Sequence, residues 1–212
     1  MRSMEALIEH MKAYGALKTP LIEEAFRRVD RKYFVPKELS EHTYEDRPLP
    51  IGRDQTISQP STVAFMLELL QPKKGDEILD IGSGSGWTTA LLCSIVGDEG
   101  NVLGLERIDE LVDFGRENLL KLGFKNRCEI KKADKTLGVK GKKFDKILVS
   151  AAAEDIPKEL FDQLKDNGVL VIPIKDSIYR FTKMPNGEIK GEKYYGFRFV
   201  PLIYEKENEN FF

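Results

Sequence analysis

The sequence has few of the residues that build metal, redox or membrane sites. It contains two cysteines and two histidines in 212 residues, and no apolar run approaches the roughly 18 residues that span a bilayer. His10 and His42 have no cysteine or carboxylate at ligand spacing, so we expect no metal site. Cys93 lies in an apolar run, and we expect Cys93 and Cys128 to be buried thiols without a redox role.

The amino-terminal residues 1–5 contain no apolar segment of the signal-peptide type, so neither secretion nor membrane insertion is expected and the cytoplasm is the default location. The chain is 41% hydrophobic and 32% charged, with a net charge of −2. This balance is typical of a folded domain and gives no electrostatic reason to expect nucleic acid as a partner. A length of 212 residues suits one α/β domain, which we expect to be a monomer.

Strand and helix patterns alternate along most of the chain, which predicts an α/β fold around a largely parallel sheet. Helical spacing marks the amino-terminal part, with a break near Pro20, and a turn at 184–187 predicts an antiparallel hairpin over 178–204. We divide the domain into a helical cap and acceptor segment (1–60), an α/β core (61–204) and a frayed tail (205–212). The predicted elements are a helix at 62–70, strand 77–81, helix 87–96, strand 101–106, helix 109–122, strands 127–132 and 144–149, helix 158–164 and strand 168–174.

A glycine-rich turn, residues 82–86, follows the first predicted strand and precedes a helix. Glycines at such a turn let a ligand approach the backbone closely. The dinucleotide fingerprint requires a third glycine where Trp87 stands, so the sequence disfavours hydride transfer from a dinucleotide cofactor. Glu106 ends the next strand, where its carboxylate could accept two hydrogen bonds from the vicinal hydroxyls of a ribose. The alternative is a tight strand-to-helix turn that binds nothing.

This arrangement resembles the S-adenosylmethionine site of class I methyltransferases. A second run, residues 44–52, reads Tyr-Glu-Asp-Arg-Pro-Leu-Pro-Ile-Gly and is followed by Gln-Thr-Ile-Ser at 55–58. Both together resemble the protein-L-isoaspartate (D-aspartate) O-methyltransferase family. The resemblance extends over about residues 5–204, with further matches at 31–36, 151–153, 163–164, 171–173 and 198–202. It implies a Rossmann-like fold with a seven-stranded sheet.

The resemblance also implies roles for individual residues. Isoaspartyl residues of damaged proteins would be the substrate, and S-adenosylmethionine the methyl donor. Glu106 would bind the ribose, Asp134 the adenine amino group, and Asp80 the glycine loop or the methionine ammonium. The residues implied in cofactor binding are Asp80, Gly82, Ser83, Gly84, Ser85, Gly86, Glu106, Arg107, Asp134 and Lys135, and those implied in substrate binding are Ile51, Asp54, Gln55, Thr56, Ile57 and Val200.

Ser58 is the candidate catalytic residue. An isoaspartyl carboxylate has a pKa near 4 and is already a nucleophile at neutral pH, so no general base is required. The resemblance implies that the Ser58 hydroxyl bonds this carboxylate and fixes its attacking oxygen. The alternative is that Ser58 caps the helix that begins near Pro60, because serine before proline is common at helix starts.

Three positions depart from the family pattern. Asp54 stands where the family usually has glycine, Lys135 replaces a second glycine after Asp134, and residues 142–145 read Lys-Lys-Phe-Asp where Ala-Pro-Tyr-Asp is usual. A carboxylate at position 54 about 6 Å from an anionic acceptor would cost up to about 2 to 3 kcal/mol at an effective dielectric constant near 20. Two other functions stay open: a methyltransferase acting on tRNA or another peptide carboxylate, and a noncatalytic module that binds the cofactor or damaged proteins.

Overall fold

The computed structural model describes residues 1–124 and 127–205, so residues 206–212 of the predicted tail lie outside the described part. A seven-stranded sheet runs through the molecule in the order β5-β4-β3-β6-β7-β8-β9. Pairs among the first five strands in this order are parallel, and β8 and β9 add an antiparallel hairpin. The predicted fold class is confirmed. The strands are β3 (Glu77–Ile81), β4 (Asn101–Glu106), β5 (Cys128–Lys132), β6 (Phe144–Val149), β7 (Leu164–Ile174), β8 (Ser177–Lys183) and β9 (Ile189–Tyr195).

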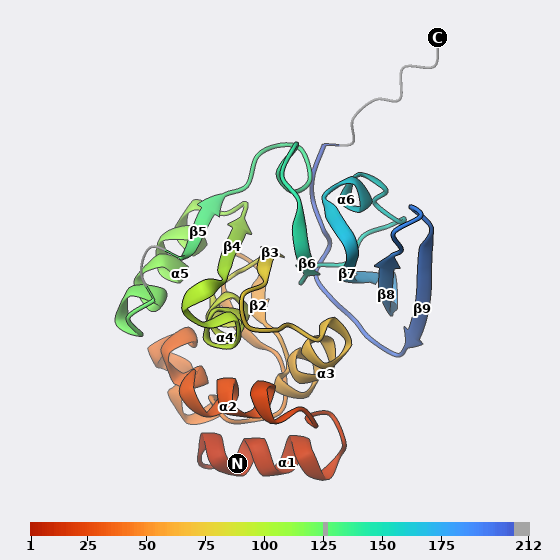
Figure 1. The fold of residues 1–212 in the computed structure, drawn as a ribbon. Coiled ribbons are helices and arrows are strands. Elements are labelled where there is room, and N and C mark those ends of the chain that lie inside the picture. Colours follow the sequence, from red (N-terminus) through yellow and green to blue (C-terminus); the bar gives the residue numbers. More distant parts are fainter. Residues whose placement is uncertain (125–126, 206–212) are drawn as a thin grey trace.

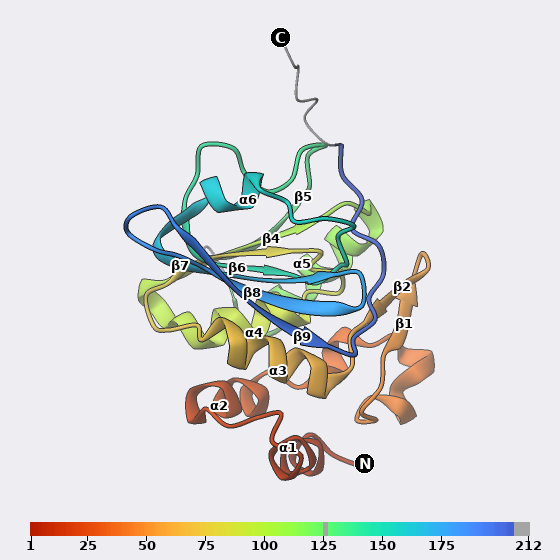
Figure 2. The same cartoon turned by 90° about the vertical axis from the view of Figure 1, so that its right-hand side faces the viewer.

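Helices cover both faces of this sheet (Figure 2). Helices α3 (Pro60–Leu70), α4 (Trp87–Val96) and α5 (Asp109–Lys121) pack on one face, and the short α6 (Glu159–Asp162) lies on the other. Most residues of β3 and β6 are buried, including the polar Asp80 and Lys146, as expected of central strands covered on both faces. Because the parallel strands all end at one edge, the loops that follow them meet there.

The amino-terminal segment forms a helical cap beneath α3 and α4 (Figure 1). Helix α1 (Met4–Ala13) is capped by the Ser3 side chain, and α2 (Pro20–Arg28) begins at the predicted break, with Pro20 at its first position. Two 3₁₀ helices follow, η1 (Arg31–Phe34) and η2 (Lys37–His42). The buried Trp87 ring packs edge-on against Phe26, with ring centroids 5.6 Å apart, and joins this cap to α4.

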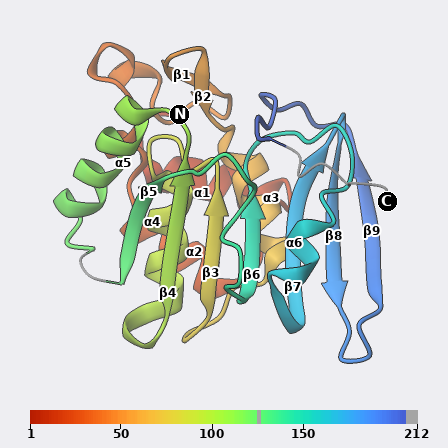
Figure 3. The ribbon, with the colours of Figure 1, turned by 90° about the horizontal axis from the view of Figure 1, so that it is seen from above.

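A two-stranded hairpin that the sequence analysis did not predict follows the cap. Strand β1 (Leu49–Gly52) pairs antiparallel with β2 (Gln55–Ile57), and Arg53 and Asp54 form the turn with φ of 52° and 58°. Positive φ at both central residues is the geometry of a tight two-residue hairpin turn. Figure 3 shows the hairpin at the edge where the parallel strands end. The fold therefore brings the proposed acceptor segment to the glycine loop.

The predicted end of one helix and the predicted start of the strand that follows it differ from the structure. The helix predicted over 158–164 is confined to α6, and β7 begins at Leu164, four residues earlier than predicted. The added strand residues include a register shift against β6, and Asn167 has a φ of 62°. Such an irregularity interrupts the alternation by which a strand is recognised in a sequence.

The prediction of two free thiols is wrong, because Cys93 and Cys128 form a disulfide. Both residues are buried, as predicted. Their separation of 35 residues hid the pairing, since only the packing of α4 against the β4–β5 edge brings their Cα atoms to 6.1 Å. This spacing is normal for a disulfide.

Candidate functional site

The glycine loop lies between the end of β3 and the start of α4. The amides of Gly82 and Ser83 donate to the Leu105 carbonyl at 2.8 and 3.1 Å, which ties the loop to the neighbouring strand. Gly82, Gly84 and Gly86 all have positive φ, a conformation that side chains with a Cβ rarely adopt. A Cβ on Gly84 would also lie 3.2 Å from Ile51 Cδ1. The loop is therefore built to expose backbone at close range.

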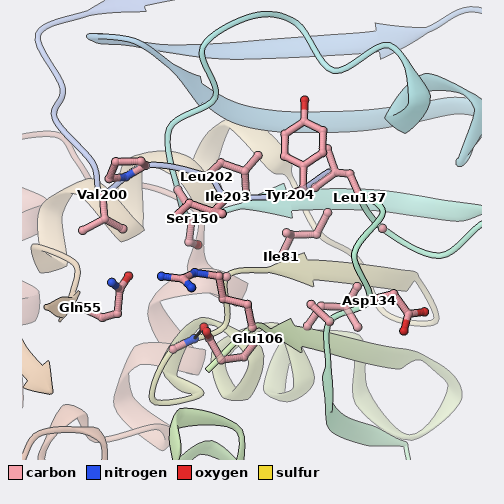
Figure 4. Close-up of a pocket in the computed structure, with 18 of the residues that line it drawn as sticks. Gln55, Ile81, Glu106, Asp134, Leu137, Ser150, Val200, Leu202, Ile203 and Tyr204 are labelled. Carbon is pink, nitrogen blue, oxygen red and sulfur yellow. Dashed lines mark hydrogen bonds between the residues drawn. The ribbon is translucent and has the colours of Figure 1, made fainter. Parts of the chain in front are cut away.

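Glu106, the last residue of β4, presents its carboxylate beside this loop. The side chain is buried, and its two oxygens accept the Gly84 amide at 3.0 Å and the Ile108 amide at 2.9 Å. A carboxylate offers about four lone-pair sites, so about two remain for a ligand. These two backbone bonds orient the group toward the cavity shown in Figure 4.

This first cavity has about 690 Å³ of space open to solvent and lies at the carboxyl ends of the parallel strands. In Figure 4, Gln55 lies on one side of the cavity and Asp134 on the other. The predicted residues that line it are Ile51, Gln55, Thr56, Gly82, Gly84, Glu106, Arg107, Asp134 and Val200.

The sequence analysis assigned no site role to the remaining residues of this lining. Ser150 and Ala133 directly follow β6 and β5, so the rule that parallel strands end together could have indicated them. The segment 200–204 could not have been placed in this way. The additional lining residues are Ile81, Leu105, Ala133, Thr136, Leu137, Gly138, Ser150, Ala151, Pro201, Leu202, Ile203 and Tyr204.

One wall of the first cavity is held by Gln163. Its side-chain oxygen accepts the Val139 amide at 2.7 Å, and its amide group donates to the Leu137 carbonyl at 3.0 Å. Gly138 lies between these residues with a φ of +77°, and a Cβ there would collide with the Gln163 amide. Gln163 is itself buried, so it fixes the backbone that closes this side of the cavity.

A second, smaller cavity of about 330 Å³ adjoins the first. Thr56, Gly82, Gly84 and Ser150 line both cavities. Hydroxyl groups dominate the second one, which lies beside the amino terminus of α4, where helix amides favour a negative charge. Its other lining residues are Ile57, Ser58, Val63, Ser83, Ser85, Trp87 and Thr88.

Ser58 lines this second cavity and does not cap α3. The N-cap residue is Gln59, which makes no side-chain capping bond. The Asp46 carboxylate performs that task, because it accepts the Ser61 amide at 2.8 Å and the Ser61 hydroxyl at 2.7 Å. The capping interpretation of Ser58 is therefore wrong, and Ser58 is one of the residues that line the second cavity.

Asp80 lies beneath the glycine loop and is fully buried. Its Oδ2 accepts the hydroxyls of Thr88 and Thr89 at 2.7 and 2.6 Å, whereas Oδ1 has no partner among the described residues. Burial raises the pKa of Asp80 to about 6, against the lowering effect of the two threonine bonds. The structure thus connects Asp80 to the first turn of α4, and its contact with a ligand stays a prediction.

Three other predicted residues are placed outside the two linings. Gly86 faces α5, since a Cβ on it would lie 3.2 Å from the Gly115 backbone. Lys135 is exposed and pairs with Glu205 at 3.1 Å. Asp54 is exposed at the tip of the β1–β2 turn. The first of these shapes the loop through packing, and the other two face solvent.

Within residues 1–124 and 127–205, no group of three or more histidine, cysteine, aspartate or glutamate side chains could hold a metal ion. The same ranges contain no helix with the length and apolar character that a bilayer span requires.

The seven-stranded sheet, the glycine loop and the strand-end carboxylate place the protein among class I S-adenosylmethionine-dependent methyltransferases. A family model described as protein-L-isoaspartate(D-aspartate) O-methyltransferase matches residues 2–207. The chain belongs to this family, which confirms the resemblance inferred from the sequence.

Individual relatives agree with this assignment. A protein-L-isoaspartate O-methyltransferase of Methanopyrus kandleri is 41% identical over 210 residues, covering 97% of this chain and 93% of the relative. One from Fervidobacterium nodosum is 43% identical over 199 residues, covering 92% and 99%. A crystal structure from Plasmodium falciparum, assigned as such an enzyme and holding S-adenosyl-L-homocysteine, superposes with a TM-score of 0.85 at 28% identity, covering 97% of this chain and all of that one.

Proposed function

We propose that this protein is a protein-L-isoaspartate O-methyltransferase, which moves a methyl group from S-adenosylmethionine to the side-branch carboxylate of isoaspartyl residues in damaged proteins. The observation that carries the proposal is the junction of the two cavities at Thr56, Gly82, Gly84 and Ser150. One cavity has the features of a nucleoside site and the other those of a carboxylate site. Family membership supports the same activity.

The first cavity suits the methyl donor. Glu106 has lone pairs left for the ribose hydroxyls, and the apolar side chains of Ile81, Leu105 and Leu137 provide surface for the adenine ring. Asp134 lines the same cavity and would accept a bond from the adenine amino group. The bound donor supplies an electrophilic methyl carbon on a sulfonium. The chain contributes a cradle that holds this cation without a strong nucleophile beside it.

The second cavity suits the acceptor carboxylate. Ser58 would donate its hydroxyl to one carboxylate oxygen and so aim the other at the methyl group, while the charge stays on the acceptor. Thr56, Ile57 and the Val200 segment would align the peptide on either side. Positioning of this kind can supply several kcal/mol of the barrier. No proton needs to move, because the acceptor is ionised at neutral pH.

The product accounts for repair. Methylation gives the side-branch carbonyl a better leaving group, because an ester releases methanol whereas a free carboxylate would have to release hydroxide. The neighbouring backbone nitrogen attacks the ester carbonyl, methanol leaves, and a succinimide forms. Water then opens the succinimide partly to normal aspartate. Repeated rounds of methylation therefore convert isoaspartate to aspartate without a further enzyme.

We also propose that the enzyme acts as a cytoplasmic monomer. The proposal of a monomer extends the expectation that 212 residues form one α/β domain. Light scattering in solution tests the oligomeric state, and a mass near 24.2 kDa is expected for a monomer.

The proposed activity is tested with labelled S-adenosylmethionine and two peptides that differ only in carrying isoaspartate or aspartate at one position. We expect base-labile methyl esters on the isoaspartyl peptide alone. Equal labelling of both peptides, or label on added tRNA instead, would indicate another acceptor. Donor binding without any transfer would indicate a noncatalytic module.

A further inference from the structure

Arg31 is a fully buried arginine that lines neither of the two cavities. It lies in η1, within the cap. Its guanidinium makes four hydrogen bonds, all to backbone carbonyls within residues 43–58. The acceptors are Thr43 O at 2.8 Å and Glu45 O, Arg47 O and Ser58 O at 3.0 Å each.

The same guanidinium lies over the Trp87 ring, with its central carbon 5.3 Å from the ring centroid. Trp87 is the first residue of α4, directly after the glycine loop, and it lines the second cavity. The indole nitrogen of Trp87 also donates to the Val29 carbonyl at 3.3 Å, two residues before Arg31. The Arg31 guanidinium therefore contacts both Ser58, the candidate catalytic residue, and Trp87, which directly follows the glycine loop.

The chemistry of arginine explains why this residue type is needed. Four carbonyls are reached from two nitrogens of one rigid fork, and the flat face remains free to stack on the indole. Burial lowers the pKa of Arg31 to about 10, against the raising effect of the Asp46 charge, so the group stays protonated at neutral pH. A lysine ammonium offers three donors around a single point and cannot reproduce this geometry.

Stability alone does not require this arrangement. A buried cation bonded only to carbonyls bears a desolvation cost that no carboxylate partner repays at close range. What the fork provides is a fixed distance between the Ser58 backbone and the start of α4. A displacement of about 1 Å at a reacting centre can lower a rate by about a hundredfold.

We infer that Arg31 is a positioning residue for methyl transfer, which holds Ser58 in register with the glycine loop through the Ser58 carbonyl and the Trp87 ring. The inference rests on the proposed function and extends it to a residue outside both cavities. It predicts that a variant with fewer hydrogen bonds from position 31 has a lower turnover but still binds the methyl donor.

The test compares Arg31→Lys with Arg180→Lys. Arg180 likewise donates to a backbone carbonyl, from its Nε to Leu69 O at 2.9 Å, but it lies on β8 and lines neither cavity. Turnover is normalised to the number of donor-binding sites found by calorimetry, so that only folded molecules are counted. We expect R31K to lower kcat at least about tenfold with a donor Kd within about threefold of the wild type, and R180K to leave both within about twofold.

A double-mutant cycle identifies the route of the effect. If Arg31 acts through Ser58, R31K should lower kcat by less than about threefold in a Ser58→Ala background. An undiminished loss in that background, or equal kcat losses in R31K and R180K, overturns the inference. Should R31K bind no donor, Arg31→Gln is used, since its neutral amide keeps up to two donors and leaves no buried charge. Failure of both variants to bind donor would make Arg31 a folding determinant and overturn the inference as well.

These outcomes are separable from the activity itself. A wild-type protein that does not methylate the isoaspartyl peptide refutes the proposed function before any variant is assayed. An active wild type with an equally active R31K refutes only the role of Arg31.

Discussion

The Asp46 carboxylate caps helix α3 through Ser61, from a position 15 residues away in the sequence. Burial acts to raise the pKa of Asp46, but hydrogen bonds from Ser61 and Gln59 outweigh it and hold the pKa below its usual range. Because the helix start is satisfied in this way, Ser58 is released from the capping task that its place before Pro60 suggested. Asp46 thus serves folding in this segment, which leaves Ser58 available for the proposed contact with the acceptor carboxylate.

Asp46→Ala should lower the free energy of unfolding by about 1 to 2 kcal/mol, the upper part of the range for losing a helix cap. Ser61→Ala, which removes the hydroxyl bond and keeps the amide bond, should cost less. Urea denaturation at pH 7 measures both. Since a depressed carboxyl pKa stabilises the fold above the pKa of the unfolded chain, the difference between wild type and D46A should shrink as the pH falls through the folded pKa of Asp46. A larger loss in S61A than in D46A would contradict the capping role.

If the first cavity binds the methyl donor, substitutions at the adjacent residues Asp134 and Lys135 should differ greatly in their effect on donor affinity. Asp134→Ala removes a charge-assisted bond of about 1.5 to 3 kcal/mol and should weaken S-adenosylmethionine binding roughly 10- to 150-fold. Lys135→Gly should be mild, because it removes only an exposed ion pair to Glu205. Calorimetry compares the two variants. The reverse order would mean that this loop does not hold the adenine.

The exposed turn position of Asp54 limits its effect on the acceptor. Asp54→Gly removes a negative charge from the β1–β2 turn and supplies the residue best suited to a φ of 58°. We expect KM for the isoaspartyl peptide to fall, by about twofold or less and only at low salt, because an exposed charge is strongly screened. Turnover should not change. A rise in KM would show that Asp54 binds a cationic feature of a different acceptor.

The disulfide should stabilise the domain without affecting catalysis. Chain-entropy arithmetic for the 35-residue separation of Cys93 and Cys128 gives about 3 to 4 kcal/mol. Replacing both cysteines with alanine should lower the unfolding free energy by an amount of this order and leave turnover at 25 °C within about twofold, because neither residue lines a cavity. Alkylation of denatured, unreduced protein provides the direct check, and two labelled thiols would contradict the linkage.

The sequence predicted the central strands well because each is a short apolar run between polar turns. Strands β3, β4 and β6 have the predicted bounds. The β1–β2 hairpin was missed, since Pro48 and Pro50 argue against a strand and its turn residues are Arg53 and Asp54 rather than glycine. Local pattern thus defined the core better than the segment that covers the site.

Site residues were predictable where a motif contains them and hidden where the fold assembles them. Glu106 and Gly84 lie where the strand-and-turn pattern indicated. By contrast, Gln163 reaches a loop 24 residues away, and the cavity wall at 200–204 returns from the far end of the chain through the pairing of Ala152 with Pro201. Contacts of this kind depend on tertiary packing, which no local spacing records.

The turnover of Ser58→Ala on an isoaspartyl peptide tests the two-cavity account most directly, with Ser61→Ala as the control from the same segment. If Ser58 aims the acceptor carboxylate, S58A keeps the donor Kd within about threefold and lowers kcat at least about tenfold, a loss of about 1.4 kcal/mol or more in transition-state stabilisation. S61A should keep kcat within about threefold. Unchanged turnover in S58A would contradict the account, because the hydroxyl in the second cavity would then take no part in methyl transfer.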